Sequence, residues 1–421
     1  MVKKLIFMGL ALFLLAGCST SESGGGAEDG TVQLKALMEE VPDSDIVIDM
    51  IADFNEKHPD IEIDVELLPY DQMRDKLVSS FLAPTSDYDI IVVDNPWMYD
   101  FASAGYLEPL SEKIEGAGDG YNFDDFSEPL RKIATVDNEV YGIPFYNYAT
   151  GLVYRKDIFE SEGIAVPGSL DELQAAAEQL AKDGKYGIAA QPQKGYKIME
   201  EWANWLFAAG GAIQDEEGNV VLDSPEARDA LTKYIESVNN AAPPNSSNWA
   251  FDEAMRSVAS GESAMTINYN WMLPTLNNEE GQAGDLAGNF ALAEVPGGKA
   301  ALGAWYWSIP AKSEYKDEVW TFIEWVSSPE TETDRVIAGG APVRNSVMNN
   351  PDVWEQGYGE EYYKTLKAIL EDAAPLADGP NAEEMIQVVG TELNAAVTGQ
   401  KSVDQAITDA ANQAKEILGN E

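Results

Sequence analysis

The sequence has few cysteine, histidine and basic residues. Its 421 residues include one Cys and one His. A single Cys excludes an internal disulfide, and the two residues together exclude metal sites built from several Cys or His ligands. Catalytic triads that need His or a Cys nucleophile are excluded for the same reason. We expect the lone His58 at a surface helix end, beside Pro59.

The charge balance excludes further classes of partner. Lys and Arg total 27 against 73 Asp and Glu, a formal net charge of −46. Such a chain has no continuous basic face for nucleic acid, and no basic patch for adhesion to an anionic membrane. Hydrophobic residues still make up 45% and aromatic residues 10%. That content predicts folded cores rather than disorder.

Sequence motifs of common enzymes are also missing. There is no G-x-x-x-x-G-K-S/T loop, no G-x-G-x-x-G behind a strand, no H-E-x-x-H and no G-x-S-x-G. Only carboxylate chemistry remains for an enzyme. We predict no cofactor and no metal site.

The N-terminus has the features of a signal for export. Lys3 and Lys4 precede an apolar run from Leu5 to Leu15, which is too short to span a bilayer. The following Ala16-Gly17-Cys18 completes a segment that resembles a bacterial lipobox. The resemblance implies a signal peptide over 1–17 and a lipid-modified, palmitate-carrying Cys18. The alternative is an ordinary signal peptide that happens to contain a Cys. Residues 18–30 are Gly/Ser-rich and predict a flexible tether.

The remaining chain alternates strand and helix patterns. Behind Pro42, with Asp43 or Ser44 as its cap, apolar residues recur at helical spacing. Residues 61–67 alternate between apolar and acidic residues, and Ile90–Val93 is continuously apolar. These patterns predict a half-buried strand and a strand buried on both faces of a parallel sheet. We therefore predict an α/β fold, and the absence of an obvious linker predicts domains made of discontinuous segments.

Aromatic side chains stand beside polar ones near predicted strand ends. Asp94-Asn95-Pro96-Trp97 directly follows Ile90–Val93, at the edge where open α/β sheets bind ligands. Four further clusters lie at 146–148, 200–205, 269–271 and 305–307. Aromatic faces cover the C–H faces of sugars, and carboxylates and amides bind their hydroxyls. Two alternatives stay open: Trp307 as a core residue, and Trp202 with Trp205 as a buried helix stripe.

With these residues the chain resembles the ABC-transporter solute-binding proteins of the sugar-binding class that includes maltose-binding protein. The segment GESAMTINYNWMLPTL (261–276) carries most of the resemblance. Other similar segments are 88–110, 141–159, 302–326 and 339–347. The resemblance implies a two-lobed, periplasmic-binding-protein-like fold with a hinge. It assigns 31–145 and 302–341 to an N-lobe, and 146–301 and 342–421 to a C-lobe.

The same resemblance implies a set of ligand-binding residues, with Trp271 as the main stacking platform. The set comprises Asp94, Asn95, Trp97, Tyr146, Tyr148, Glu201, Trp202, Trp271, Trp305, Tyr306 and Arg344. At Asn95 and Tyr148 the chain departs from maltose-binding protein itself. A monosaccharide, disaccharide or polyol is therefore as well supported as a long maltooligosaccharide.

The leading hypothesis is a monomeric carbohydrate receptor, lipid-anchored to the outer face of the cell membrane. It would deliver its ligand to the transmembrane subunits of an ABC permease that is driven by a separate ATPase. A second hypothesis is a receptor for a cationic solute such as a polyamine, which the net charge favours. A third is a lipid-anchored glycoside hydrolase, which needs two carboxylates across the sugar. We predict no enzymatic activity, because the closing cleft implied by the resemblance releases its cargo unchanged and needs no acid–base pair.

Overall fold

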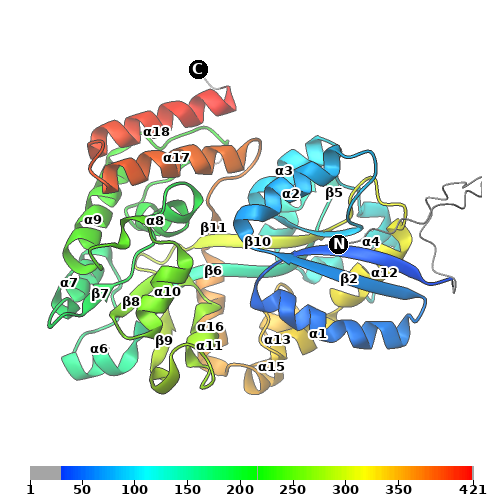
Figure 1. Ribbon diagram of the computed structural model, residues 1–421, viewed down its shortest axis with the longest axis horizontal. Helices are drawn as coiled ribbons and strands as arrows, with labels where there is room; N and C mark the ends of the chain where they lie inside the picture. Colours follow the sequence, from blue (N-terminus) through cyan, green and yellow to red (C-terminus); the bar gives the residue numbers. More distant parts are fainter. Residues whose placement is uncertain (1–29, 216, 420–421) are drawn as a thin grey trace, which may run out of the picture.

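The computed structural model describes residues 30–215 and 217–419 (Figure 1). The predicted signal peptide, Cys18 and all but the last residue of the predicted tether lie outside the described residues. Within the described ranges no helix is long and apolar enough to cross a membrane.

A mixed nine-stranded sheet runs through the molecule in the order β2-β1-β3-β10-β6-β8-β7, with β11 paired to β10 and β9 to β6. Its strands are β1 (Val32–Glu39), β2 (Ile61–Leu68), β3 (Ile90–Asp94), β6 (Ile143–Arg155), β7 (Tyr186–Ile188), β8 (Ser263–Tyr269), β9 (Phe290–Ala293), β10 (Ala301–Ser308) and β11 (Ala374–Pro375). Strands β4 (Thr135–Val136) and β5 (Glu139–Val140) form a separate hairpin. Both strands predicted from residues 61–67 and 90–93 are confirmed, and all five residues of β3 are buried.

Helices cover the sheet at both ends. The first group is α1 (Pro42–Lys57), α2 (Tyr70–Leu82), α3 (Asn95–Ser103), α4 (Ser111–Ala117), α5 (Glu128–Ile133), α12 (Lys316–Val326) and α13 (Pro329–Ile337). The second is α6 (Lys156–Glu162), α7 (Leu170–Leu180), α8 (Tyr196–Ala208), α9 (Pro225–Ala241), α10 (Phe251–Ala259), α11 (Met272–Asn277), α17 (Ala382–Val397) and α18 (Val403–Leu418). Between them lie α14 (Asn345–Met348), α15 (Pro351–Gln356) and α16 (Glu360–Glu371).

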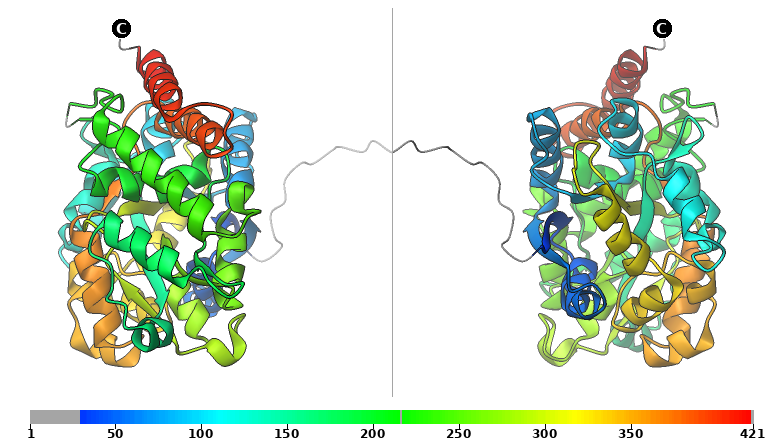
Figure 2. Two further views of the ribbon diagram at one scale, coloured as in Figure 1. Left: turned by 90° about the vertical axis from the view of Figure 1, so that its left-hand side faces the viewer. Right: turned by 90° about the vertical axis from the view of Figure 1, so that its right-hand side faces the viewer.

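The arrangement has two lobes. The first lobe holds β1–β3 and the first helix group, and the second lobe holds β7–β9 and the second group (Figure 1). Strand β6 belongs to both, because residues 143–149 pair with β10 and residues 150–155 pair with β8 and β9. Figure 2 shows each lobe end-on, with α17 and α18 along one edge of the molecule.

The start of α1 differs from the prediction. Val41, not Asp43 or Ser44, occupies the cap position, and no side chain caps the helix. Pro42 stands at the first helical turn, where its missing N–H costs nothing. Asp43 instead accepts hydrogen bonds from the Arg335 guanidinium, the Ala341 N–H and the Tyr148 hydroxyl. At the far end of α1, the His58 ring stacks on Phe54.

Candidate ligand-binding cleft

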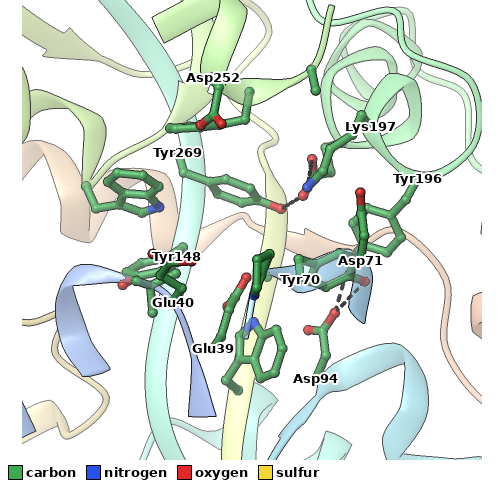
Figure 3. A pocket seen from close by; sticks show the side chains of 18 of the residues that line it. Glu39, Glu40, Tyr70, Asp71, Asp94, Tyr148, Tyr196, Lys197, Asp252 and Tyr269 are labelled. Atoms are coloured by element: carbon green, nitrogen blue, oxygen red, sulfur yellow. Dashed lines mark hydrogen bonds and ion pairs between the residues drawn. The ribbon is translucent and has the colours of Figure 1, made fainter. Parts of the chain in front are cut away.

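A cavity of about 520 Å³ lies between the two lobes (Figure 3). This volume falls within the range of about 300–1,000 Å³ that is usual for small-molecule sites. Both lobes supply its walls, and β10 contributes Gly303 and Trp305. Its side chains are Glu39, Glu40, Val41, Pro69, Tyr70, Asp71 and Asp94 from the first lobe, and Tyr148, Gln193, Tyr196, Lys197, Glu200, Ala250, Phe251, Asp252, Tyr269 and Trp271 from β6 and the second lobe.

The first-lobe wall is built at the carboxyl ends of parallel strands. Glu39 ends β1 and Asp94 ends β3, and β1 pairs in parallel with β3. Tyr70 follows β2 at the first residue of α2. Strands with parallel direction bring their last residues to one edge of the sheet, which is why three sequence-distant side chains meet here.

Tyrosine hydroxyls and carboxylates are paired around the cavity. Tyr146 donates to Glu39 at 2.6 Å, and Tyr269 donates to Glu200 at 3.0 Å. One oxygen of Asp94 accepts from Tyr70 of the first lobe at 3.0 Å and from Tyr196 of the second lobe at 3.4 Å. Each hydrogen bond fixes a ring in place. The second oxygen of Asp94 accepts from the Asn95 N–H at 2.9 Å, and the second oxygen of Glu200 is paired with Lys197. Among these three acids, Glu39 alone keeps an oxygen without a hydrogen-bond or ion-pair partner in the described residues, so the arrangement offers oriented aromatic faces beside one open carboxylate oxygen.

Burial changes the protonation of these acids. It raises the pKa of Glu39 to about 7, although the Tyr146 hydroxyl and Lys197 offset part of the effect. It raises the pKa of Asp94 well above its ordinary value, and the nearby charges of Glu39 and Glu383 add to the increase. Lys197 forms an ion pair with Glu200 at 3.1 Å. The second oxygens of Glu39 and Asp94 have no Lys or Arg within ion-pairing distance among the described residues.

Two indoles provide the apolar surface. Trp271 is half-buried at the end of β8, with its ring 4.7 Å from Phe251 and 6.0 Å from Tyr148. Trp305 of β10 packs edge-on against Trp97 at 5.3 Å and lies against Tyr146 at 5.8 Å. Gly303, two residues earlier, leaves room for Tyr269, whose hydroxyl would lie 3.2 Å from a Cβ at that position. The three aromatic residues Trp271, Trp305 and Tyr269 therefore face one space.

The structure brings several sequence-predicted site residues together. Asp94, Tyr148, Trp271 and Trp305 line the cavity. Tyr146 lies directly behind them, stacked on Tyr148 at 4.7 Å.

Two more predicted residues lie next to this group. The Asn95 amide oxygen accepts from the Ala304 N–H at 3.2 Å and so holds β10 at the cleft. Trp97 lines a neighbouring cavity, and its indole N–H donates to Glu383 at 3.1 Å.

Glu201 and Trp202 do not line the cleft. Both are fully buried inside the second lobe, where Glu201 accepts from the Gln191 N–H and the Tyr234 hydroxyl at 2.7 Å each. Glu200, one position earlier, faces the cleft instead, because successive residues of a helix point about 100° apart. Trp202 belongs to the interior stripe with Trp205, which is the alternative that the sequence left open.

Tyr306 and Arg344 are also core residues here. Tyr306 is fully buried and does not line the cleft, and the pairing of β10 with β6 shifts register between Trp305 and Tyr306. Arg344 is fully buried, donates to the carbonyls of Ser327 and Asn122, and covers the Phe126 ring at 3.8 Å. Trp307 packs on Phe145 in the core, as predicted.

Sequence reasoning missed much of the cleft lining. Glu39 ends β1, so the strand-end rule that selected Asp94 applies to it as well. Tyr70 follows Pro69 at the end of another predicted strand, which is the same signal. Tyr196 and Lys197 belong to no pattern in the sequence, and only the packing of α8 brings them to the cleft. No group of three or more His, Cys, Asp or Glu side chains within 30–215 and 217–419 could hold a metal ion.

The fold and the interlobe cleft define a bacterial solute-binding protein with two lobes. Residues 31–333 match the family model described as bacterial extracellular solute-binding protein, and the chain belongs to that family. The two-lobed periplasmic-binding-protein-like fold is thereby confirmed, as is the resemblance to ABC-transporter solute-binding proteins.

Relatives in this family have different named ligands. A mannitol-binding protein of Pseudomonas aeruginosa is 27% identical, covering 85% of this chain and 86% of its own. A probable amino-acid ABC transporter periplasmic-binding protein of Sinorhizobium fredii is 23% identical, covering 85% and 83%. The structure of maltose-bound MalE3 from T. maritima superposes with a TM-score of 0.84 at 25% identity, covering 92% of this chain and all of that one.

Proposed function

We propose that this protein captures a small neutral carbohydrate or polyol in the interlobe cleft and delivers it to an ABC import permease. The observation that carries the proposal is the set of tyrosine–carboxylate pairs around Trp271 and Trp305. Oriented rings cover the C–H faces of a sugar, and the free oxygen of Glu39, together with Lys197 and the tyrosine hydroxyls, forms hydrogen bonds with its hydroxyls. Relatives whose names refer to mannitol and to erythritol/L-threitol support this ligand class.

Calorimetry against a panel of neutral ligands tests the proposal. The panel comprises erythritol, ribitol, mannitol, lactose, maltose and maltotriose. We expect at least one to bind, with an affinity that changes little between 50 mM and 500 mM salt, because a neutral ligand carries no charge to be screened. Failure of every neutral ligand, with tight binding of a polyamine, a peptide or a metal chelate, would refute it.

A cationic solute is the second candidate, and the charge of the lining favours it. Six carboxylates line the cavity against one basic residue, Lys197, which is already paired with Glu200. Unbalanced carboxylates attract cations, and the same indoles can face an amine. Spermidine titrated at two salt concentrations separates this candidate from a neutral sugar, because its affinity should fall steeply with added salt.

The proposed mechanism is closure of the lobes on the ligand about β6 and β10. We propose the lobe boundaries 31–145 with 302–341 and 146–301 with 342–421. A ligand that contacts both lobes only when they are closed shifts the population toward the closed form. No acid–base chemistry is needed for a cargo that is released unchanged, so we propose a binding protein rather than a hydrolase. Hydrolysis of an aryl glycoside that is abolished by Asp94→Asn would contradict this.

We propose that Cys18 carries a lipid anchor and that the monomer works at the outer face of the cell membrane. Two acyl chains provide stable anchoring where one does not. Radiolabelled palmitate should label the intact protein and not the Cys18→Ser variant. Equal labelling of the two proteins would exclude this cysteine as the lipid site.

A further inference from the structure

A second cavity adjoins the ligand cleft. It has a volume of about 560 Å³, and its lining includes Trp97 from the first lobe and Glu383 from α17. The two cavities share five residues: Tyr70, Asp71, Gln193, Tyr196 and Lys197. The wall between them is therefore made by the first turn of α2 on one side and the start of α8 on the other.

Two tyrosines form the centre of this wall. Tyr70 and Tyr196 come from opposite lobes, and their ring centroids are 4.9 Å apart. Both hydroxyls point to the same oxygen of Asp94 (Figure 3). The Lys197 ammonium lies 4.7 Å from the Tyr70 ring centre and 5.5 Å from that of Tyr196. We call Tyr70, Tyr196 and Lys197 the tyrosine partition.

Neighbouring aromatic side chains fix the tyrosine partition in place. The Tyr70 ring packs against Trp97 at 5.6 Å and edge-on against Trp305 at 6.0 Å. Trp97 is in turn fixed by its hydrogen bond to Glu383. Tyr196 is 6% exposed. A ring with contacts on both sides has little rotamer freedom, so a ligand does not easily displace it.

The second cavity has the groups that a polar ligand needs. Arg74 lines it, and its buried Nε atom has no hydrogen-bond partner. Glu384 and Gln387 from the exposed side of α17 add acceptors and a donor. The space beyond the partition is therefore polar and unfilled rather than packed with apolar side chains.

We propose that the tyrosine partition sets the length specificity of the cleft. It makes the ligand cavity blind at this end, so that a bound sugar presents a chain end to Tyr70 and Tyr196. The second cavity becomes an additional subsite only when the partition is opened. This inference rests on the proposed carbohydrate ligand and adds which part of that ligand is recognised.

Paired variants at Tyr196 test the partition. Tyr196→Ala removes the ring, whereas Tyr196→Phe keeps the ring and removes only the hydroxyl. Calorimetry with mannitol, maltose, maltotriose and maltotetraose gives the length preference of each protein. We expect Tyr196→Ala to raise the affinity for the longer sugars relative to the shorter by at least tenfold compared with Tyr196→Phe. The same length preference in both variants would overturn the inference.

A second measurement keeps the test valid if Tyr196→Ala does not fold. Maltose with a p-nitrophenyl group at its reducing end is compared, on the unaltered protein, with maltose blocked by a 4,6-ethylidene group at its other end. We expect one derivative to bind as maltose does and the other to lose at least tenfold in affinity. Equal binding of both derivatives would overturn the inference. Tyr70→Ala, made in the other lobe, should restore the excluded derivative.

The outcomes separate the two proposals. If none of these sugars or polyols binds the unaltered protein, the proposed function fails. If some bind and neither the variants nor the blocked sugars discriminate, the carbohydrate function stands and only the partition is refuted.

Discussion

At the scale of single residues, the cleft depends on pairs in which a phenol holds a carboxylate. An intramolecular hydrogen bond contributes about 0.5–1.5 kcal/mol to stability. Here these bonds also fix the ring: the Tyr148 hydroxyl donates to Asp43 at 2.6 Å, and the Tyr148 ring is tilted against Trp271 with the centroids 6.0 Å apart. The aromatic residues that line the cleft and the acids that hold them in position are thus adjacent in space and distant in sequence.

Trp271→Ala tests the stacking surface. Removing the indole should weaken sugar binding by roughly 1–3 kcal/mol, the range found for truncating a binding anchor. Calorimetry with the tightest-binding neutral sugar measures the change, and thermal unfolding checks the fold. Tyr315→Ala removes an exposed aromatic side chain that does not line the cleft and serves as the control. An unchanged affinity in Trp271→Ala would remove Trp271 from the site.

Glu201→Gln tests a buried acid of the second lobe. Burial raises the pKa of Glu201 to about 7, and hydrogen bonds from Gln191 and Tyr234 only partly offset this. The folded protein therefore keeps a proton on Glu201 that the unfolded chain releases near the ordinary glutamate pKa of 4.5. The free energy of unfolding falls as the pH rises from 4.5 to 7.

The neutral amide of Glu201→Gln should remove the loss of stability that comes from burying an ionised carboxylate. We expect Glu201→Gln to increase the free energy of unfolding by up to about 3 kcal/mol above pH 7 and by little near pH 4.5. Urea unfolding at pH 5 and pH 8 measures the effect, with the exposed Glu226→Gln as control. A variant no more stable than the parent at pH 8 would contradict the assignment.

At the scale of elements, helix α8 connects the core of the second lobe with the cleft. Tyr196, Lys197 and Glu200 face the cavity, whereas Glu201 and Trp205 face the interior. Gly195 is the N-cap of the helix, and its positive φ of 90° favours glycine. Its first turn is held by α17, which approaches the Gly195 backbone closely at Gly390.

Gly390→Ala tests that close contact. A Cβ at this position would lie 1.9 Å from the Gly195 carbonyl oxygen, so α17 and the start of α8 must separate. We expect a loss of stability of about 1–3 kcal/mol, as for other overpacked sites, and weaker sugar binding because Tyr196 follows Gly195 directly. Thermal unfolding and calorimetry measure the two effects. Thr391→Ala, on the same helix turn, should change neither, and normal affinity in Gly390→Ala would show that α8 is positioned by other contacts.

At the scale of the whole molecule, the two lobes share β6 and β10 and face each other across an acidic cleft. Contacts already join the lobes beside the cleft. The Asn381 N–H, next to α17, donates to Asp100 of α3 at 3.0 Å, and Trp97 donates to Glu383. Closure therefore has to act mainly away from these contacts. Glu40 of the first lobe and Asp252 of the second lobe also line the cleft.

Small-angle X-ray scattering tests closure. Addition of a saturating neutral sugar that binds in calorimetry should reduce the radius of gyration, because the ligand contacts both walls. The Trp271→Ala variant, measured at a sugar concentration that saturates only the parent, should keep the larger radius. A radius that does not change on saturation of the parent would mean that binding occurs without lobe movement.

The sequence could predict the fold and part of the site. Alternation in residues 61–67 and the apolar run Ile90–Val93 predicted two strands correctly, because strand burial leaves a local pattern. Asp94 follows from the strand-end rule alone. The same rule applies to Glu39, but local periodicity does not contain the order of the strands, which is what places Glu39 beside Asp94.

The sequence by itself determined which functional groups the protein has: one Cys, one His, an excess of acids, and aromatic residues beside polar ones at strand ends. Only the tertiary structure decided which of these residues meet. On α8 it is Glu200 that lines the cleft, whereas Glu201, the next residue, is buried in the core. Long-range packing places Arg344 on Phe126 in the core. It also brings Tyr70 and Tyr196 together from opposite lobes. Local patterns record burial, whereas the direction of each side chain depends on partners far away in the chain.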